Sequence, residues 1–239
     1  MEVAKIFGRF NPKVCRFDVG IGGLQEFDTH DYLAALSYMK SEFGRDLLCR
    51  MYWPEGAKLS LEELKKGMYA RLVDEWVKRE YDMLMAIPGL PDGGGTLQRF
   101  QRADARRWPG MAIDKDGKPK HDPRYASLCH AALTELFTAD PCKTCNGLGE
   151  ITDADGVKFE CLVCLGFGRK AWGYRTRAKA IGVNEKSYKE QGWDRAYVWA
   201  VRTMLKEVDQ DYMNALGSEW GVESSPAKGI TCDGANDEA

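Results

Sequence analysis

Apolar residues recur every three or four positions along much of the chain, which is the spacing of amphipathic helices that share a core. This pattern predicts helices over residues 29–43, 46–53, 61–81, 123–137 and 193–216. Gly44 and Pro54 are expected to end the first two helices, and Asp122 with Pro123 to begin the fourth. The sequence therefore predicts a mainly α-helical fold.

The long helix at 61–81 has a clear start signal. Ser60 and Glu63 form a capping box, in which the serine hydroxyl accepts a hydrogen bond from the first turn and the glutamate reaches back to the cap. The apolar stripe of this helix is predicted to lie in the core and comprises Leu64, Met68, Leu72, Trp76 and Tyr81.

Regular spacing is lost in three segments. Residues 1–28 are predicted to form an N-terminal arm, residues 88–122 a long loop within the helical body of 29–140, and residues 218–239 a disordered acidic tail. Within the loop, Arg99, Arg102 and Arg106 fall on one helical face. That face has two interpretations, a solvated surface helix or a basic element that contacts nucleic acid or a protein partner.

A doubled cysteine motif interrupts the helical pattern. The sequence Cys-x-x-Cys-x-Gly-x-Gly occurs at residues 142–149 and again at 161–168. Two cysteines three positions apart on a tight turn can bind one metal ion, and a second pair completes a tetrahedral site. We therefore predict one structural Zn²⁺ bound by Cys142, Cys145, Cys161 and Cys164.

The residues between the two pairs predict the shape of this zinc module, residues 141–171. Two β-prone runs flank the turn at 153–156, so a small β-rich ribbon is expected to be inserted into the helical chain. The motif glycines are expected to adopt positive φ angles or to let the backbone approach the metal closely. Disulfides or a redox-active dithiol are the alternatives. Disulfides fit less well, because clustered cysteines without a signal peptide indicate a reducing compartment. A redox-active dithiol fits less well, because it usually occurs as a single pair in a βαβ context.

Positive charge is concentrated directly after the zinc module. Residues 169–206 contain ten basic and three acidic residues, a local charge of +7 in a chain whose net charge is -2. Phosphate groups respond to local fields, so this segment is a candidate nucleic-acid surface.

The same basic segment has the residue spacing of a helix-turn-helix, within a unit spanning residues 172–217. Ala178 permits close approach of two helices, Gly182 supplies the turn, and Val183 and Tyr188 bury the second helix. Gln191 occupies a position where an apolar residue is expected, which predicts an early end to that helix. The alternative is a plain helical hairpin with a glycine turn.

If this unit binds DNA, the second helix would meet base edges or phosphates in the major groove, and the first would contact the backbone. The predicted DNA-contacting residues are Arg175, Arg177, Asn184, Lys186, Ser187 and Lys189. No apolar run approaches the length of a membrane span, and a metal with four protein ligands has no open position for catalysis. We therefore expect a cytoplasmic protein that is not an enzyme and has no membrane partner.

Taken together, these features resemble the late-gene antitermination proteins Q of lambda-type bacteriophages. The similarity is sharp in the two cysteine motifs and looser over residues 3–7, 11–13, 31–35 and 128–131 and the helical stretch through Arg202 and Met204. The four cysteines match the zinc ligands of that family, and residues 184–189 match its DNA-reading helix approximately. The chain departs from the family in a longer segment near 88–122 and a longer tail.

The resemblance implies a transcription factor in the cytoplasm of a bacterial host. Proteins of this family bind double-stranded DNA within a late promoter and contact the sigma factor and the flap of paused host RNA polymerase. They then make the polymerase read through pauses and terminators, and nascent RNA or elongation factors are further candidate partners. Two alternatives stay open: a simple promoter-binding regulator, and a DnaJ-type co-chaperone, a class that carries the same cysteine repeat four times.

Overall fold

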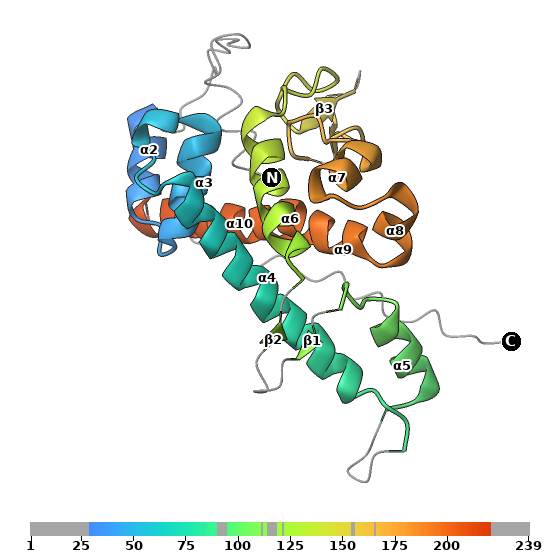
Figure 1. Ribbon diagram of the computed structural model, residues 1–239. Coiled ribbons are helices and arrows are strands. Elements are labelled where there is room, and N and C mark those ends of the chain that lie inside the picture. Colours follow the sequence, from blue (N-terminus) through green and yellow to red (C-terminus); the bar gives the residue numbers. More distant parts are fainter. Residues whose placement is uncertain are drawn as a thin grey trace, which may run out of the picture.

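The computed structural model describes residues 29–89, 95–110, 112–113, 119–120, 122–153, 156–164 and 166–220. The helices are α2 (Thr29–Ser37), α3 (Glu42–Tyr52), η1 (Pro54–Gly56), α4 (Leu61–Leu84), α5 (Leu97–Asp104), α6 (Arg124–Thr138), α7 (Tyr174–Ile181), α8 (Glu185–Glu190), α9 (Trp193–Val198), the π-helical turn η2 (Trp199–Thr203) and α10 (Met204–Trp220). The strands are β1 (Ala112–Ile113), β2 (Pro119–Lys120), β3 (Glu150–Thr152) and β4 (Lys158–Glu160). The predicted mainly helical fold is confirmed (Figure 1). The predicted arm at 1–28 and residues 221–239 of the predicted tail lie outside the described residues.

The helices pack around one hydrophobic core that draws residues from Ala35 to Leu216. Helix α10 packs against α2 and α3, η2 packs against α6, and α6 packs against α4 and α7. Large aromatic side chains fill the centre, among them Tyr125, Trp193 and Tyr197. Because α6 contacts elements on both sides of it, it is the central helix of the fold (Figure 1).

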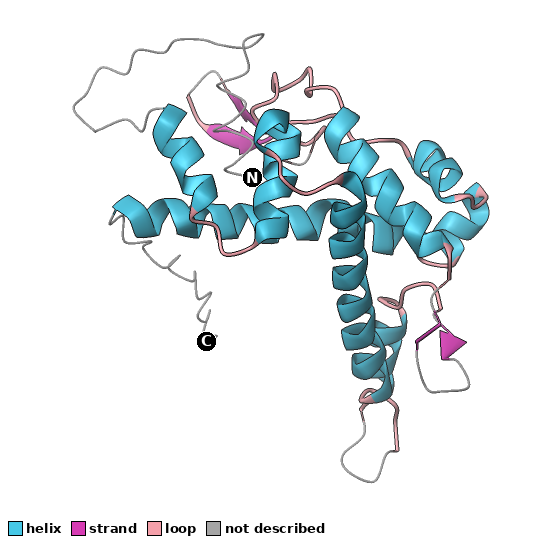
Figure 2. Cartoon of the chain, turned by 60° about the vertical axis from the view of Figure 1, so that its left-hand side comes forward, coloured by secondary structure: helices cyan, strands magenta, loops and turns pink. Residues whose placement is uncertain are grey.

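Helix α4 confirms the capping box but corrects part of the predicted core. The Ser60 side chain accepts a hydrogen bond from the Glu63 N–H, and the Glu63 carboxylate accepts one from the Ser60 N–H. The first four residues of the apolar stripe, Leu64 to Trp76, are buried, whereas Tyr81 is 61% exposed. The reason is that α4 extends beyond the packed helices, so its last turns have less of the body to cover them (Figure 2).

The boundary between the first two helices differs from the prediction. Helix α2 ends at Ser37, and α3 begins at Glu42, so Gly44 lies inside a helix and does not terminate one. Ser41 is the N-cap of α3, because its side chain accepts the Gly44 N–H at 3.0 Å. The Ser41 N–H in turn donates to the Asp211 carboxylate of α10 at 3.2 Å. A contact distant in sequence therefore helps to place this cap.

The predicted helix at 193–216 is present but is not uniform. It comprises α9, the π-helical turn η2 and α10, and its predicted apolar face from Tyr197 to Leu216 is buried. Helix α10 continues to Trp220, so residues 218–220 are helical and do not belong to a disordered tail. Gly217 weakens a helix by only about 1 kcal/mol and does not necessarily end it. Among the described residues, no helix combines the length and the apolar character needed to cross a membrane.

The predicted loop at 88–122 contains structured elements. Helix α5 begins after Thr96, whose hydroxyl accepts the Arg99 N–H at 3.2 Å, and β1 pairs with β2 in an antiparallel ribbon. Trp108 follows α5 and is 2% exposed, with its ring 5.4 Å from that of Trp199 in η2. The segment is therefore anchored to the core at Trp108.

Candidate functional site

The four cysteines of the doubled motif converge on one point. Their sulfur atoms all lie within 4.8 Å of one another, and all four side chains are buried. The Cys142 and Cys161 sulfurs are 3.9 Å apart, and those of Cys145 and Cys164 are 3.7 Å apart. Tetrahedral zinc with Zn–S bonds of about 2.3 Å requires sulfur separations of about 3.8 Å. A disulfide would require about 2.05 Å. The cluster therefore fits one four-coordinate metal ion.

The backbone explains how the two cysteine pairs meet. Strands β3 and β4 pair in antiparallel register, with Ile151 opposite Phe159, and this hairpin returns the second pair to the first. The motif glycines all have positive φ, as predicted. Gly149 has a further requirement, since a Cβ there would collide with the Gly166 carbonyl oxygen. Its N–H points to the Cys145 sulfur at 3.2 Å, which is the orientation that stabilises a thiolate.

The surroundings of the sulfurs affect their protonation differently. Burial alone would raise the pKa of the Cys142 thiol, but hydrogen bonds from the N–H groups of Cys145 and Thr144 lower it to about 7. Burial raises the pKa of Cys145 and Cys164 above the ordinary thiol value. Metal binding must therefore displace protons from the cluster, which makes metal affinity depend on pH.

The basic segment forms two short helices joined by a tight turn. Gly182 ends α7 with φ of 80°, and the Val183 N–H donates to the Ala178 carbonyl at 3.0 Å. Ala178 and Tyr188 are each 1% exposed, so the predicted inner contacts are formed. Helix α8 ends at Glu190, as the Gln191 position predicted. We call α7, the turn and α8 the helical hairpin.

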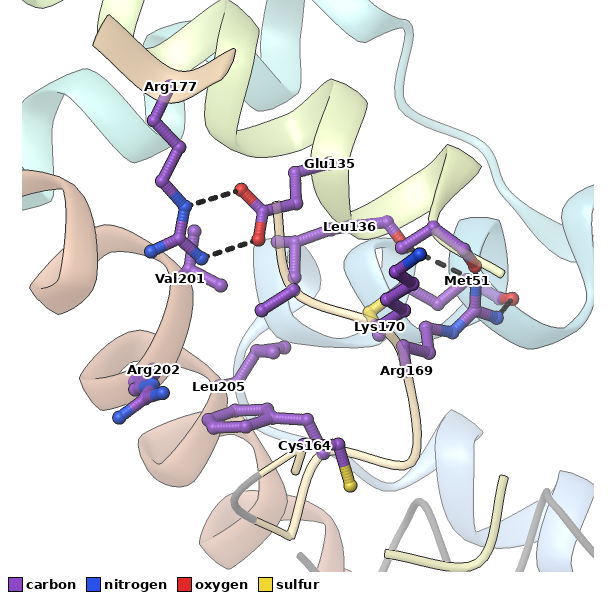
Figure 3. Close-up of a pocket in the computed structure, with 13 residues that line it drawn as sticks. Met51, Glu135, Leu136, Cys164, Arg169, Lys170, Arg177, Val201, Arg202 and Leu205 are labelled. Atoms are coloured by element: carbon purple, nitrogen blue, oxygen red, sulfur yellow. Dashed lines mark hydrogen bonds and ion pairs between the residues drawn. The ribbon is translucent and has the colours of Figure 1, made fainter. Parts of the chain in front are cut away.

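The structure corrects the prediction for Arg177. Its side chain does not face solvent but points into the molecule, where two of its nitrogens donate to the Glu135 carboxylate at 2.6 and 3.0 Å (Figure 3). The same guanidinium lies 4.9 Å from the centre of the Tyr197 ring. Burial alone would lower the pKa of Arg177, but hydrogen bonding to Glu135 raises it. Arg177 is therefore a charged internal residue, and its guanidinium is not exposed for the predicted phosphate contact.

The other predicted DNA-contacting residues lie on the outside of the helical hairpin. Asn184 is the N-cap of α8, and its side-chain oxygen accepts the Ser187 N–H at 2.7 Å, so this oxygen is not free to read a base. Arg175 is exposed and lies 3.3 Å from Glu185, and Lys186 lies 4.0 Å from Glu190. The Lys189 amine is 4.2 Å from the Tyr174 ring.

The zinc module and the helical hairpin are both fastened to the helical body at one pocket. Arg169, directly after the second cysteine motif, donates to the carbonyls of Met51 at 2.5 Å and Ala139 at 3.2 Å. The Trp172 N–H donates to Glu135 at 3.0 Å. Figure 3 shows Arg169 and the Glu135–Arg177 pair around the pocket, with Arg202 of η2 on its other side.

Glu135 links the hairpin and the zinc module to α6, and the sequence prediction did not include it. It accepts hydrogen bonds from both Arg177 and Trp172 and is 2% exposed. A signal was available, because Glu135 stands seven positions after Leu128 and three after Ala132 on the apolar face of its helix. An acidic residue at such a position needs an internal partner, because an unpaired buried charge is costly.

We expect the cluster to bind one zinc ion per chain. Replacing Cys161 by Ala should reduce the bound zinc from one ion to near zero, measured by elemental analysis after gel filtration. Acidification should release the ion, since protonated thiols do not bind it. Cys129→Ala is the matched control, because Cys129 is a buried cysteine outside the cluster. Equal zinc content in the two variants would contradict the assignment.

We expect the Glu135–Arg177 pair to control the stability of the fold. Glu135→Ala should lower the free energy of unfolding by about 3–5 kcal/mol, because it leaves the buried guanidinium unpaired. Glu185→Ala, which removes the exposed partner of Arg175, should cost less than about 1 kcal/mol. Urea unfolding of the zinc-loaded variants measures both values. Similar losses in the two variants would argue against this role for Glu135.

Comparison with known proteins gives no relative from which a function can be transferred. No family model matches the chain, and no curated protein and no solved structure matches it.

Proposed function

We propose that this protein is a DNA-binding transcription antitermination factor that loads onto paused bacterial RNA polymerase. The observation that best supports DNA binding is the outer surface of the helical hairpin. Four cations, Arg175, Lys179, Lys186 and Lys189, are exposed there, while the inner side of the hairpin is buried in the core. A short helix held rigidly with its polar side outward is suited to enter a major groove.

The two acidic residues on this surface do not prevent phosphate binding. The Arg175–Glu185 and Lys186–Glu190 pairs are both exposed to solvent, and such pairs contribute less than about 1 kcal/mol each. A duplex offers a dense line of phosphates, and replacing bound counterions provides a favourable driving force. We infer that these cations exchange their weak intramolecular partners for phosphates.

The polymerase part of the proposal rests on the resemblance to the phage Q proteins. A factor that must leave its DNA site when polymerase moves needs only moderate DNA affinity. Simultaneous contact with polymerase raises the overall affinity, because the polymerase contact holds the protein close to the DNA and increases its effective concentration there. The zinc module and the pocket residues around Glu135 have a structural role in this proposal, because they orient the helical hairpin.

A second candidate function is supported by the apolar surface of the zinc module. Leu162 is 81% exposed, Val163 62% and Phe159 53%, all within the module. Exposed apolar side chains on a zinc ribbon suit the binding of unfolded clients, as in DnaJ-type co-chaperones. They also suit docking onto another folded protein, which is consistent with the polymerase-bound role.

The proposal predicts terminator readthrough that depends on the helical hairpin. In transcription with purified bacterial polymerase on a phage late promoter followed by a terminator, the protein should increase the readthrough product. Lys186→Gln with Lys189→Gln should reduce this gain and lower the salt slope of DNA binding by about two units. Lys58→Gln with Lys66→Gln is the matched control, because both lysines are exposed but lie in and before the first turns of α4.

Two outcomes would count against antitermination. DNA binding without readthrough would favour a simple promoter-binding regulator. Suppression of aggregation of an unfolded client, without DNA affinity, would favour the co-chaperone function.

A further inference from the structure

We propose that α5 forms a second phosphate-binding surface beside the helical hairpin, so that one duplex contacts both. This inference rests on the proposed DNA binding and extends it to the segment in which this chain departs from the phage Q family. The position of α5, its attachment to the helical body and its unpaired arginines support this proposal. In Figure 1, α5 and α8 lie on the same side of α4.

The turn that follows α5 is joined to the corner between α8 and α9. Arg195 of α9 donates two hydrogen bonds to the Arg107 carbonyl, at 2.8 and 3.1 Å. The same carbonyl oxygen lies 3.0 Å from the position that a Cβ at Gly192 would occupy. Gly192 lies two residues after the last residue of α8. The backbone that follows α5 therefore contacts the corner directly after α8, the helix proposed to enter the major groove.

This junction is held firmly on the other side as well. Arg107 forms a bidentate ion pair with Glu80 of α4, at 2.9 and 3.0 Å. The next residue, Trp108, is buried between Trp199 and the Arg79 guanidinium, which lies 4.6 Å from a Trp108 ring centre. Helix α5 also packs against α4. An isolated helix of eight residues would be only marginally stable, so these contacts fix its position.

The exposed charge of α5 is not neutralised. Arg99, Arg102 and Arg106 are exposed, and among the described residues none of their guanidinium groups pairs with a carboxylate. Asp104 is the one acidic residue between positions 97 and 107, so these residues contribute a charge of +2 besides the Arg107–Glu80 pair. The helical hairpin itself exposes four cations and two acidic residues, also +2. Residues 97–107, which comprise α5 and the turn after it, therefore double the net positive charge available to a duplex on this side.

The length of α5 suits contact with several phosphates of a duplex. Eight residues at a rise of about 1.5 Å each make α5 about 12 Å long. The phosphate charges of a duplex are spaced by about 1.7 Å along its axis, so a helix of this length passes several of them. We infer that α5 contacts the phosphate backbone next to the groove occupied by α8, and that Arg99 and Arg102 make these contacts.

The test measures how DNA affinity depends on salt concentration. A fluorescent duplex of mixed sequence and about three helical turns serves as the probe, because phosphate contacts do not depend on sequence. Arg99→Gln with Arg102→Gln should lower the slope of log affinity against log salt by about two units, since each phosphate contact contributes about 0.9. Arg99→Lys with Arg102→Lys should retain most of the slope, because it preserves the charge. Circular dichroism should show equal helix content in all variants.

The control variants separate this inference from the proposed function. Lys58→Gln with Lys66→Gln removes the same charge at the far end of α4 and should leave the slope unchanged. If the wild-type protein binds and the Lys186 and Lys189 variant loses slope, but the Arg99 and Arg102 variant behaves like this control, the role of α5 is wrong while DNA binding stands. If the wild-type protein does not bind the duplex at all, the proposed function fails as well.

Discussion

The arrangement of the zinc module and the helical hairpin depends on the hydrogen bonds to the buried carboxylate of Glu135. Glu135 lies on the central helix α6 and accepts hydrogen bonds from the chain leaving the zinc module and from the first helix of the helical hairpin. Removing one partner of a buried ion pair destabilises a protein, but replacing both partners with apolar residues often stabilises it. The presence of the pair is therefore weak evidence that it makes the fold more stable. Its bidentate geometry instead favours one orientation of the hairpin, because any rotation of α7 would separate two charges in an apolar environment.

The zinc module is expected to depend on a bound metal for a different reason. Among the described residues of the module, the four cysteines form the buried hydrophobic cluster, while the apolar side chains of Leu162, Val163 and Phe159 face solvent. A ribbon of two three-residue strands has too little apolar area to fold by itself. A metal bound by the four cysteines would take the place of a hydrophobic core. Arg169 attaches the module to α3 and α6 by donating hydrogen bonds to the Met51 and Leu136 carbonyls. This division of roles leaves the apolar surface available for a partner.

The sequence predicted those features that depend on local spacing. The helices, the capping box at Ser60, the four cysteines and the turn at Gly182 all follow from periodicity or motif spacing, and the structure contains each of them. The errors arose where distant residues decide the outcome. Ser41 caps a helix and donates a hydrogen bond to Asp211. Tyr81 is exposed because the end of α4 extends beyond the packed helices. Arg177 points inward because it pairs with the buried Glu135. In each case the deciding partner or packing surface lies far away in the chain.

In the proposed function, the composition of α8 would limit how a duplex is recognised. The helix has six residues, Asn184 is used as its cap, and Tyr188 belongs to the core, so few side chains are left to read bases. Lysines at 186 and 189 are point charges that suit phosphates better than the paired acceptors of a base. In the proposed function, sequence preference therefore comes only partly from this helix. The remaining discrimination has to come from the shape of the duplex along an extended basic surface, or from the simultaneous contact with a polymerase that is already positioned on its promoter.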